Sequence, residues 1–142
     1  MQNIYLFLMM IIGGAMANET AKNVLGEPLK ICCTKPMTGY YRDGYCRTGK
    51  EDAGSHVIAA AVTKEFLEFS KSRGNDLMTP MPSSNFPGLK PGDRWCLCAH
   101  RWKEAQEAGV APPVLLDSTH ENALKYVTIE TLRSYALKES VF

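Results

Sequence analysis

The sequence predicts an α+β fold: a single small domain with a mixed β-sheet of three to five strands, helices mainly on one face of the sheet, and one β-α-β unit. Three observations lead to this prediction. Residues 57–62 are a nearly continuous run of small apolar side chains, which is typical of a strand buried on both faces. Residues 94–117 alternate between strand-like and helix-like segments. The chain of 142 residues is long enough for one domain with its own core.

The first expected element is a β-hairpin with its tip at Asp43-Gly44. Aromatic runs at residues 40–42 and 45–47 flank this dipeptide. Asp-Gly between two such runs is a strong signal for a two-residue hairpin turn. Residues 49–54 are polar, and we expect them to form the loop that leads into the buried strand.

A helix over residues 64–73 is expected next. Thr63 is its predicted N-cap, and Gly74 is expected to end it in the left-handed conformation. Residues 75–93 then form a long loop with four prolines. A loop of this length in a small domain is often a binding loop or a lid, and the alternative is a well-packed surface loop.

The predicted β-α-β unit starts with a strand over residues 94–99. A helix over residues 100–108 follows, and a short strand over residues 114–117 completes the unit. Residues 99–111 are just long enough to connect two parallel strands.

Two further helices are expected before the C-terminus. Ser118 and Glu121 have the spacing of a capping box, which predicts a helix that ends near Val127. Thr128 is the expected N-cap of a last helix over residues 129–137.

The N-terminus resembles a signal peptide. Residues 4–12 are apolar, and a small-x-small trio precedes Asn18, so residues 1–17 have the form of a cleavable leader. The apolar run is too short to span a bilayer, which takes about 20 residues. Cleavage of this leader would mean export, and the alternative is a cytoplasmic protein that starts at Met16.

The remaining boundaries follow from the element pattern. We expect a linker over residues 18–22, a single α+β domain over residues 23–137, and a mobile tail over residues 138–142.

Composition and charge exclude several classes of protein. The net charge is +1, from 16 basic and 15 acidic residues that are interleaved along the chain, so there is no basic cluster of the kind that nucleic acids require. Glycine-rich phosphate-binding patterns and the G-x-S-x-G pattern of serine hydrolases are absent. We expect a small molecule or a protein as the partner, no nucleic acid, and no stable membrane insertion once the leader is removed.

Five cysteines, at positions 32, 33, 46, 96 and 98, cannot all pair within one chain. A disulfide between the adjacent Cys32 and Cys33 would be strained. On a regular strand, Cys96 and Cys98 lie about 6.6 Å apart along one face, too far to pair with each other. In an oxidising compartment Cys46 would pair with Cys96 or Cys98, and closing that loop would contribute about 4 kcal/mol. The alternative is that all five cysteines are small buried apolar residues.

The densest stretch of the sequence, FPGLKPGDRWCLCAHRW over residues 86–102, is the predicted location of the functional site. We expect the tip at residues 43–44 and the loop before Trp95 to converge there around one pocket. A nucleophilic cysteine needs a neighbouring base or a helix N-terminus. The catalytic candidates are therefore three thiols with two possible bases: Cys46, Cys96, Cys98, His56 and His120.

Ligand binding without chemistry is a second hypothesis for the same pocket. An arginine can hold a carboxylate or phosphate with two hydrogen bonds, and an indole offers a flat apolar face. The candidates are polar or aromatic residues at turn-strand junctions: Arg42, Asp43, Asp93, Arg94 and Trp95. The alternative is that the charged members only tie the hairpin and the long loop together.

Two further readings of the same residues stay open. One is a protein-interaction module in which the cysteines are structural. The other is a Cys/His metal-binding domain, although the sequence has no C-x-x-C pair and predicts no specific metal site or cofactor.

Several long strings of the sequence resemble one protein family. NVLGEPL, TGYYRDGYCRTG, SRGNDLMTP, FPGLKPGDRWCLCAHRW and APPVLLDSTH are similar to the bacterial family known as Domain of Unknown Function 2237. The resemblance runs from about Asn23 to Leu137. It implies a small α+β domain and no established activity, substrate or cofactor. The apolar leader and Cys33 depart from the family's pattern.

Overall fold

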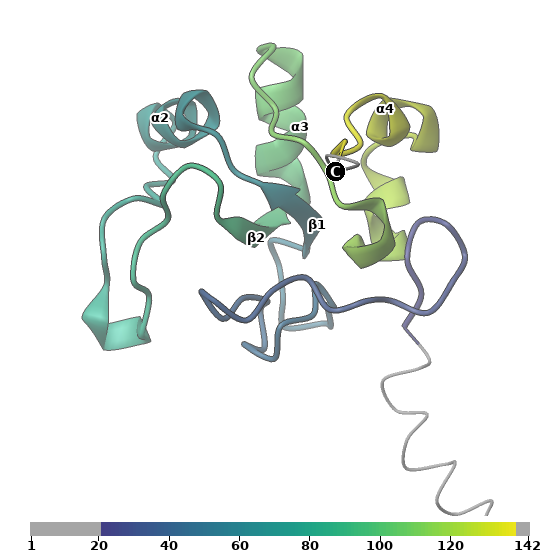
Figure 1. Ribbon diagram of the computed structural model, residues 1–142, viewed down its shortest axis with the longest axis horizontal. Helices are drawn as coiled ribbons and strands as arrows, with labels where there is room; N and C mark the ends of the chain where they lie inside the picture. Colours follow the sequence, from purple (N-terminus) through teal and green to yellow (C-terminus); the bar gives the residue numbers. More distant parts are fainter. Residues whose placement is uncertain (1–20, 139–142) are drawn as a thin grey trace, which may run out of the picture.

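The computed structural model describes residues 21–138 (Figure 1). The predicted leader, residues 1–17, lies outside this part of the chain, as do most of the predicted linker and tail. In chain order the elements are β1 (His56–Ala61), α2 (Lys64–Ser72), the 3-10 helix η1 (Pro82–Ser84), β2 (Arg94–Cys98), α3 (Ala99–Glu107), the 3-10 helices η2 (Leu116–Ser118) and η3 (Glu121–Lys125), and α4 (Ile129–Ser134). The fold combines helices with a small sheet in one domain, as the sequence predicts.

The sheet is smaller than predicted. Within residues 21–138 it has two strands, β1 and β2, which pair antiparallel with Ala59 opposite Cys96 and His56 opposite Cys98. The register shifts once, between His56 and Ile58. The prediction of three to five strands is therefore wrong for the part of the chain that the structure describes.

The predicted strand over residues 114–117 is reduced to isolated bridges at Val114. Val114 pairs antiparallel with Ala60 of β1 and parallel with Ala136. Pro113 has no N–H to extend the pairing, and the chain turns into η2 at Leu116. The chain after α3 does return parallel to β2, but β1 lies between them, so the predicted β-α-β unit lacks its second strand.

The predicted hairpin around Asp43-Gly44 is also absent, because residues 40–45 form turns and bends and residues 46–47 belong to no strand. A two-residue hairpin of the Asp-Gly type needs positive φ at both residues of the dipeptide. Here the left-handed residues are Arg42, at φ 56°, and Gly44, at φ 89°. The Asp43 carboxylate accepts the Tyr45 N–H at 3.1 Å, which stabilises a tight turn without flanking strands.

The helix predicted after β1 is confirmed. The Thr63 hydroxyl accepts the Phe66 N–H at 3.1 Å at the start of α2, and Gly74 follows its end at φ 90°. The helix predicted over residues 100–108 is α3, one residue earlier. It ends before Gly109, whose φ is 79°.

The C-terminal helices differ from the prediction in length and type. The expected capping box fails because His120, not Ser118, caps the next turn, and that turn is the 3-10 helix η3. The Thr128 hydroxyl accepts the Thr131 N–H and caps α4, as predicted. However, α4 ends at Ser134 and not at residue 137. Leu137 donates its N–H to the Val114 carbonyl, so it is held beside Val114 and not in the helix.

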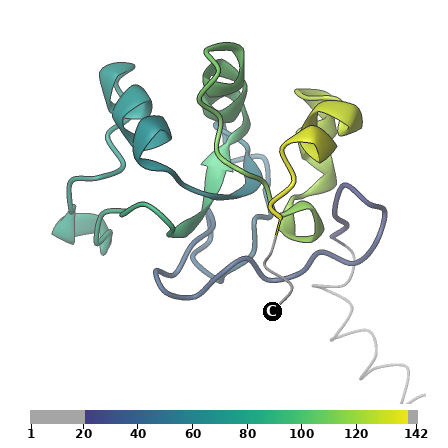
Figure 2. The same cartoon turned by 45° about the horizontal axis from the view of Figure 1, so that its top comes forward.

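The two faces of the sheet bury different cores. In both views α2, α3 and α4 stand on one side of β1 and β2, and residues 21–55 cross the other side (Figures 1 and 2). The helical side packs Ile58 and Leu97 against residues such as Phe66 and Trp102. The opposite side holds a second, smaller core of Cys32, Cys46, Ala59, Cys96 and Leu115.

The alternation of the strands explains this division, because successive side chains point to opposite faces. Within residues 21–138 no helix is long and apolar enough to cross a membrane.

Candidate functional site

Three segments that are far apart in the sequence meet at one groove of about 520 Å³. They are the turn at residues 39–42, the long loop at residues 75–86, and the start of β2. In Figure 1 the long loop leaves α2 and extends toward the side of the sheet that residues 21–55 cover. The groove is lined by Gly39, Tyr40, Arg42, His56, Asn75, Asp76, Leu77, Met81, Ser84, Phe86, Trp95 and Cys96. The structure thus brings together the turn, the loop and the strand that the sequence predicts to converge.

Arg42 and Trp95, both predicted ligand-binding residues, form one wall of the groove. The Arg42 guanidinium lies 5.1 Å from the centre of the Trp95 ring, and its Nη1 donates to the Gly39 carbonyl at 2.5 Å. Phe86 packs edge-on against the same indole, with ring centres 5.3 Å apart. This wall therefore combines a fixed positive charge with aromatic surface. Sequence reasoning missed the contribution of Phe86, although it lies in the dense stretch.

The other predicted ligand-binding residues do not line the groove. Asp43 binds Arg47 at 2.7 Å, and Asp93 accepts the Lys90 N–H at 2.9 Å, so both carboxylates hold turns in place. The Arg94 carbonyl accepts the Cys33 thiol at 2.9 Å. For these two aspartates the alternative reading, that they tie loops together, describes the contacts better.

His56, a predicted base, lines the groove and is oriented by a carboxylate. Its Nδ1 lies 2.7 Å from Oδ1 of Asp52, whose side chain is completely buried. The second carboxylate oxygen accepts the His56 N–H at 2.9 Å and the Thr48 hydroxyl at 3.0 Å. Tyr40 stacks on the imidazole with ring centres 6.0 Å apart.

The electrostatics of this pair favour an ionised Asp52. Burial alone would raise the pKa of Asp52, but the hydrogen bonds from His56 and Thr48 outweigh burial and lower that pKa below its ordinary value. The carboxylate therefore stays charged and holds a proton on Nδ1 of His56, which leaves Nε2 as the nitrogen that can take up another. Sequence reasoning missed Asp52, because the polar loop at residues 49–54 carries no signal of a buried carboxylate.

Cys98, a predicted nucleophile, lies on β2 opposite His56, its partner on the neighbouring strand β1. The two residues are register partners of β1 and β2, and such partners have Cβ atoms about 4.5–5.5 Å apart. Cys98 is a free, partly exposed thiol and the N-cap residue of α3. Both side chains border a second cavity of about 190 Å³, which shares His56, Asn75, Leu77, Trp95 and Cys96 with the groove.

Cys46 and Cys96, the other two predicted nucleophiles, are joined in a disulfide with Cα atoms 5.2 Å apart. This is one of the two pairings that the sequence predicts for an oxidising compartment. Neither sulfur is a thiol in this state, so neither is a nucleophile. The sulfur of Cys32 lies within 4.8 Å of both, and a bound metal would need the disulfide reduced, since thiolates are the ligands.

His120, the other predicted base, has a structural role. Its ring Nδ1 accepts the Asn122 N–H at 3.0 Å, and its backbone N–H donates to the Val57 carbonyl of β1. Burial lowers the pKa of its imidazole, so the ring is neutral near pH 7 and acts as a helix cap. It lines neither the groove nor the second cavity.

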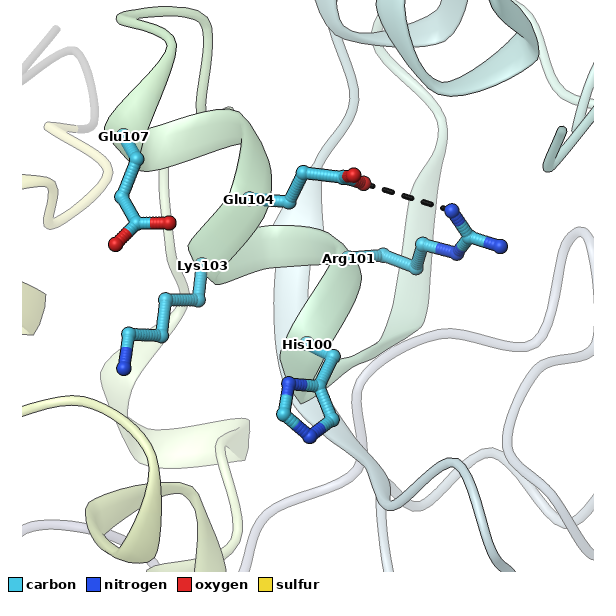
Figure 3. Close-up of a pocket in the computed structure, with 5 residues that line it drawn as sticks. All are labelled: His100, Arg101, Lys103, Glu104 and Glu107. Carbon is cyan, nitrogen blue, oxygen red and sulfur yellow. Dashed lines mark hydrogen bonds and ion pairs between the residues drawn. The ribbon is translucent and has the colours of Figure 1, made fainter. Parts of the chain in front are cut away.

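A separate hollow lies on the outer surface of α3. Its side chains all come from this one helix, with Arg101 and Glu104 paired at 3.5 Å (Figure 3). His100 packs against the Tyr126 ring, with ring centres 5.1 Å apart. The hollow is therefore a solvated helix face and not a place where distant elements converge.

Comparison with known proteins identifies a family. The family described as "Uncharacterized protein conserved in bacteria (DUF2237)" matches residues 22–136, and a search of curated proteins finds no match. The matched segment contains the groove, the disulfide and both strands, and it covers most of the chain. The chain therefore belongs to the DUF2237 family of uncharacterised bacterial proteins.

Proposed function

We propose that the protein is a thiol-dependent enzyme that binds a small molecule in the groove and attacks it with the sulfur of Cys98. His56 takes the thiol proton on Nε2, and Asp52 holds the imidazole in the required orientation. The observation that carries the proposal is the cross-strand position of Cys98 opposite His56, whose Nδ1 is bound to a buried carboxylate. A nucleophile, a base and a group that orients the base are the parts that covalent thiol catalysis needs.

The position of Cys98 also supports this role. As the N-cap residue of α3, it lies at the end of the helix where backbone N–H groups favour negative charge. Cys98 lines the second cavity and not the groove, but the two share five lining residues, among them His56, so a molecule that fills the groove and reaches into the second cavity meets Cys98.

The lining of the groove defines the class of ligand. Phe86, Trp95 and Leu77 offer an apolar surface, and the Arg42 guanidinium lies against the indole. Arginine has more N–H donors than its bond to Gly39 uses. We therefore propose a small ligand with a flat or apolar body, a carboxylate or phosphate that Arg42 binds, and an electrophilic carbon near Cys98.

Thiol reactivity tests this function. Native protein is treated with iodoacetamide at pH 7, and alkylation of each cysteine is followed by peptide mass spectrometry. Cys98 should react readily, and His56→Asn should slow its alkylation by about tenfold or more, because the base is lost. His100→Asn is the matched control and should leave the rate unchanged, because His100 lies on the outer face of α3.

The same measurement separates the alternative reading of the chain as a protein-interaction module. Under that reading Cys98 reacts slowly, and His56→Asn does not change the rate. Slow alkylation of Cys98 in the native protein, at a rate that is equal in both histidine variants, would overturn the enzymatic proposal.

A further inference from the structure

We propose that Cys32 and Cys33 form a thiol relay that connects the buried Cys46–Cys96 disulfide with thiols in solution. This site is distinct from the pair of Cys98 and His56. Its function would be to transfer reducing equivalents between the solvent and the second core, and so to set the redox state of the bond that fastens residues 21–55 to β2.

Four of the five cysteines gather in one place. The sulfurs of Cys32, Cys46 and Cys96 all lie within 4.8 Å of one another. The sulfurs of Cys32 and Cys33 are 3.1 Å apart. An unbroken row of sulfur atoms thus leads from Cys33 through Cys32 to the disulfide.

The burial of these residues shows why a relay is needed. Cys46 is 0% exposed and Cys96 is 1% exposed, so the disulfide offers almost no surface to a small external thiol in the folded protein. Cys32 is also buried, at 7% exposure, and Cys33 is partly exposed. Cys33 is therefore the only member of this cluster that is accessible to an external thiol.

The pKa shifts of Cys32 and Cys33 agree with Cys33 as the outer thiol and Cys32 as the inner one. The hydrogen bond between the two thiols, together with burial, raises the pKa of Cys32. The same hydrogen bond, helped by the positive charge of Arg94, lowers the pKa of Cys33. The pair thus holds one proton after the first ionisation, with the negative charge on the outer sulfur.

The first exchange needs no external reagent. The Cys32 proton moves across the 3.1 Å contact to the Cys33 thiolate, and the Cys32 thiolate attacks one sulfur of the disulfide. A bond forms between Cys32 and Cys96 or Cys46, the original S–S bond breaks, and the other cysteine leaves as a thiolate that takes up the proton now held by Cys33, which becomes a thiolate again. One disulfide is lost and one is gained, so electrons balance.

Two further exchanges complete the transfer. The Cys33 thiolate attacks the Cys32 sulfur and releases the second buried cysteine as a thiolate, which takes up a proton from water, and a disulfide between adjacent residues remains. Such a strained bond is readily attacked by an external dithiol at the accessible Cys33 sulfur. The dithiol is oxidised to its cyclic disulfide, and the protein ends with four thiols in the cluster.

The rate of reduction of the Cys46–Cys96 bond tests the relay. Native protein is incubated with dithiothreitol at pH 8, quenched with acid, and mapped by mass spectrometry after alkylation of the free thiols. Both Cys33→Ser and Cys32→Ser should slow reduction by about tenfold or more, because thiol–disulfide exchange then has no path to the buried bond. Cys98→Ser is the matched control and should leave the rate unchanged.

The direction of the expected change in reduction rate distinguishes the relay from a general loss of stability. A variant that is merely destabilised opens more often and is reduced faster, which is the opposite of the expected result. Reduction at an unchanged or higher rate in Cys33→Ser would overturn the proposal. If Cys32→Ser does not fold, Cys33→Ser alone gives the decision, because Cys33 is partly exposed and its replacement leaves the core intact. Failure of the relay would leave the Cys98 proposal untouched, because the alkylation rates there concern a different thiol.

Discussion

Asp52 is the residue whose side chain most constrains the candidate site. It is fully buried, and its two oxygens hold His56 through both the ring and the backbone. A buried carboxylate without these hydrogen bonds would cost several kcal/mol. The orientation of His56 and the stability of the loop before β1 therefore depend on the same contacts.

Replacement of Asp52 should destabilise the protein at neutral pH more than at acid pH. The folded-state pKa of Asp52 lies below its ordinary value of 3.8, so its ionised form stabilises the fold above that value. This contribution is lost as the pH falls through the lower folded-state pKa. We expect Asp52→Asn to lower the free energy of unfolding by about 1–3 kcal/mol at pH 7. Urea unfolding at pH 7 and near pH 3 checks this, and a difference that does not shrink in acid would contradict it.

At the scale of elements, the turn at residues 39–45 places Arg42 in the groove. Gly39 has φ of 99°, and a Cβ atom there would overlap the Tyr45 carbonyl oxygen. Gly26 has a similar φ of 81°, but a Cβ atom there would meet nothing within 4 Å. The two glycines thus both have a positive φ, but the space around them differs.

This pair of glycines gives a matched prediction. Gly26→Ala should cost about 1 kcal/mol, the penalty for the left-handed conformation alone. Gly39→Ala should cost clearly more, because the turn has to move to relieve the overlap, and Arg42 should then lose its contact with Trp95. Guanidinium unfolding curves of the two variants measure the loss in unfolding free energy. Equal midpoints for Gly26→Ala and Gly39→Ala would contradict the prediction.

The elements that the sequence predicts correctly are those that depend on local signals. Thr63 and Gly74 bracket α2 because capping and left-handed termination involve only neighbouring residues. The errors occur where distant contacts decide. Residues 40–47 have a hairpin pattern, but the disulfide from Cys46 to β2 and the hydrogen bond from the Cys32 N–H to the Gly44 carbonyl hold them in a different shape.

In the candidate site, too, the sequence predicts some features, while others depend on distant contacts. The convergence of the turn, the loop and β2 followed from the density of polar and aromatic residues in the sequence. The selection of Cys98 over Cys46 and Cys96 does not follow from the sequence, because it depends on which cysteine of β2 lies next to Cys46 and forms the disulfide. Asp52 was missed because nothing in its neighbours indicates that a polar loop buries one carboxylate.

At the scale of the whole molecule, the disulfide links two parts that the sheet alone does not join. Cys46 belongs to the segment that crosses the face of the sheet opposite the helices, and Cys96 lies in β2 (Figure 2). The bond closes a loop with a sequence separation of 50 residues. It therefore restricts the unfolded chain and fixes the segment that carries Arg42.

Removal of this bond should cost much of the stability. The double variant Cys46→Ala, Cys96→Ala should lose about 4 kcal/mol, as expected for a closed loop of this length. Its thermal midpoint should fall to that of the wild type in the presence of reductant, because both then lack the same restraint. A midpoint in the variant that equals the oxidised wild type would contradict the prediction.

The side chains that hold residues 33–38 against β2 also change what the edge of this strand offers to another chain. A strand without a neighbour presents free N–H and C=O groups that invite pairing with another chain. Here the buried Thr38 hydroxyl accepts the Cys96 N–H at 2.9 Å, and the Cys33 thiol donates to the Arg94 carbonyl. These two contacts occupy backbone groups at the border of the sheet that a third strand would otherwise pair, so a hydroxyl and a thiol leave fewer free groups there for another chain.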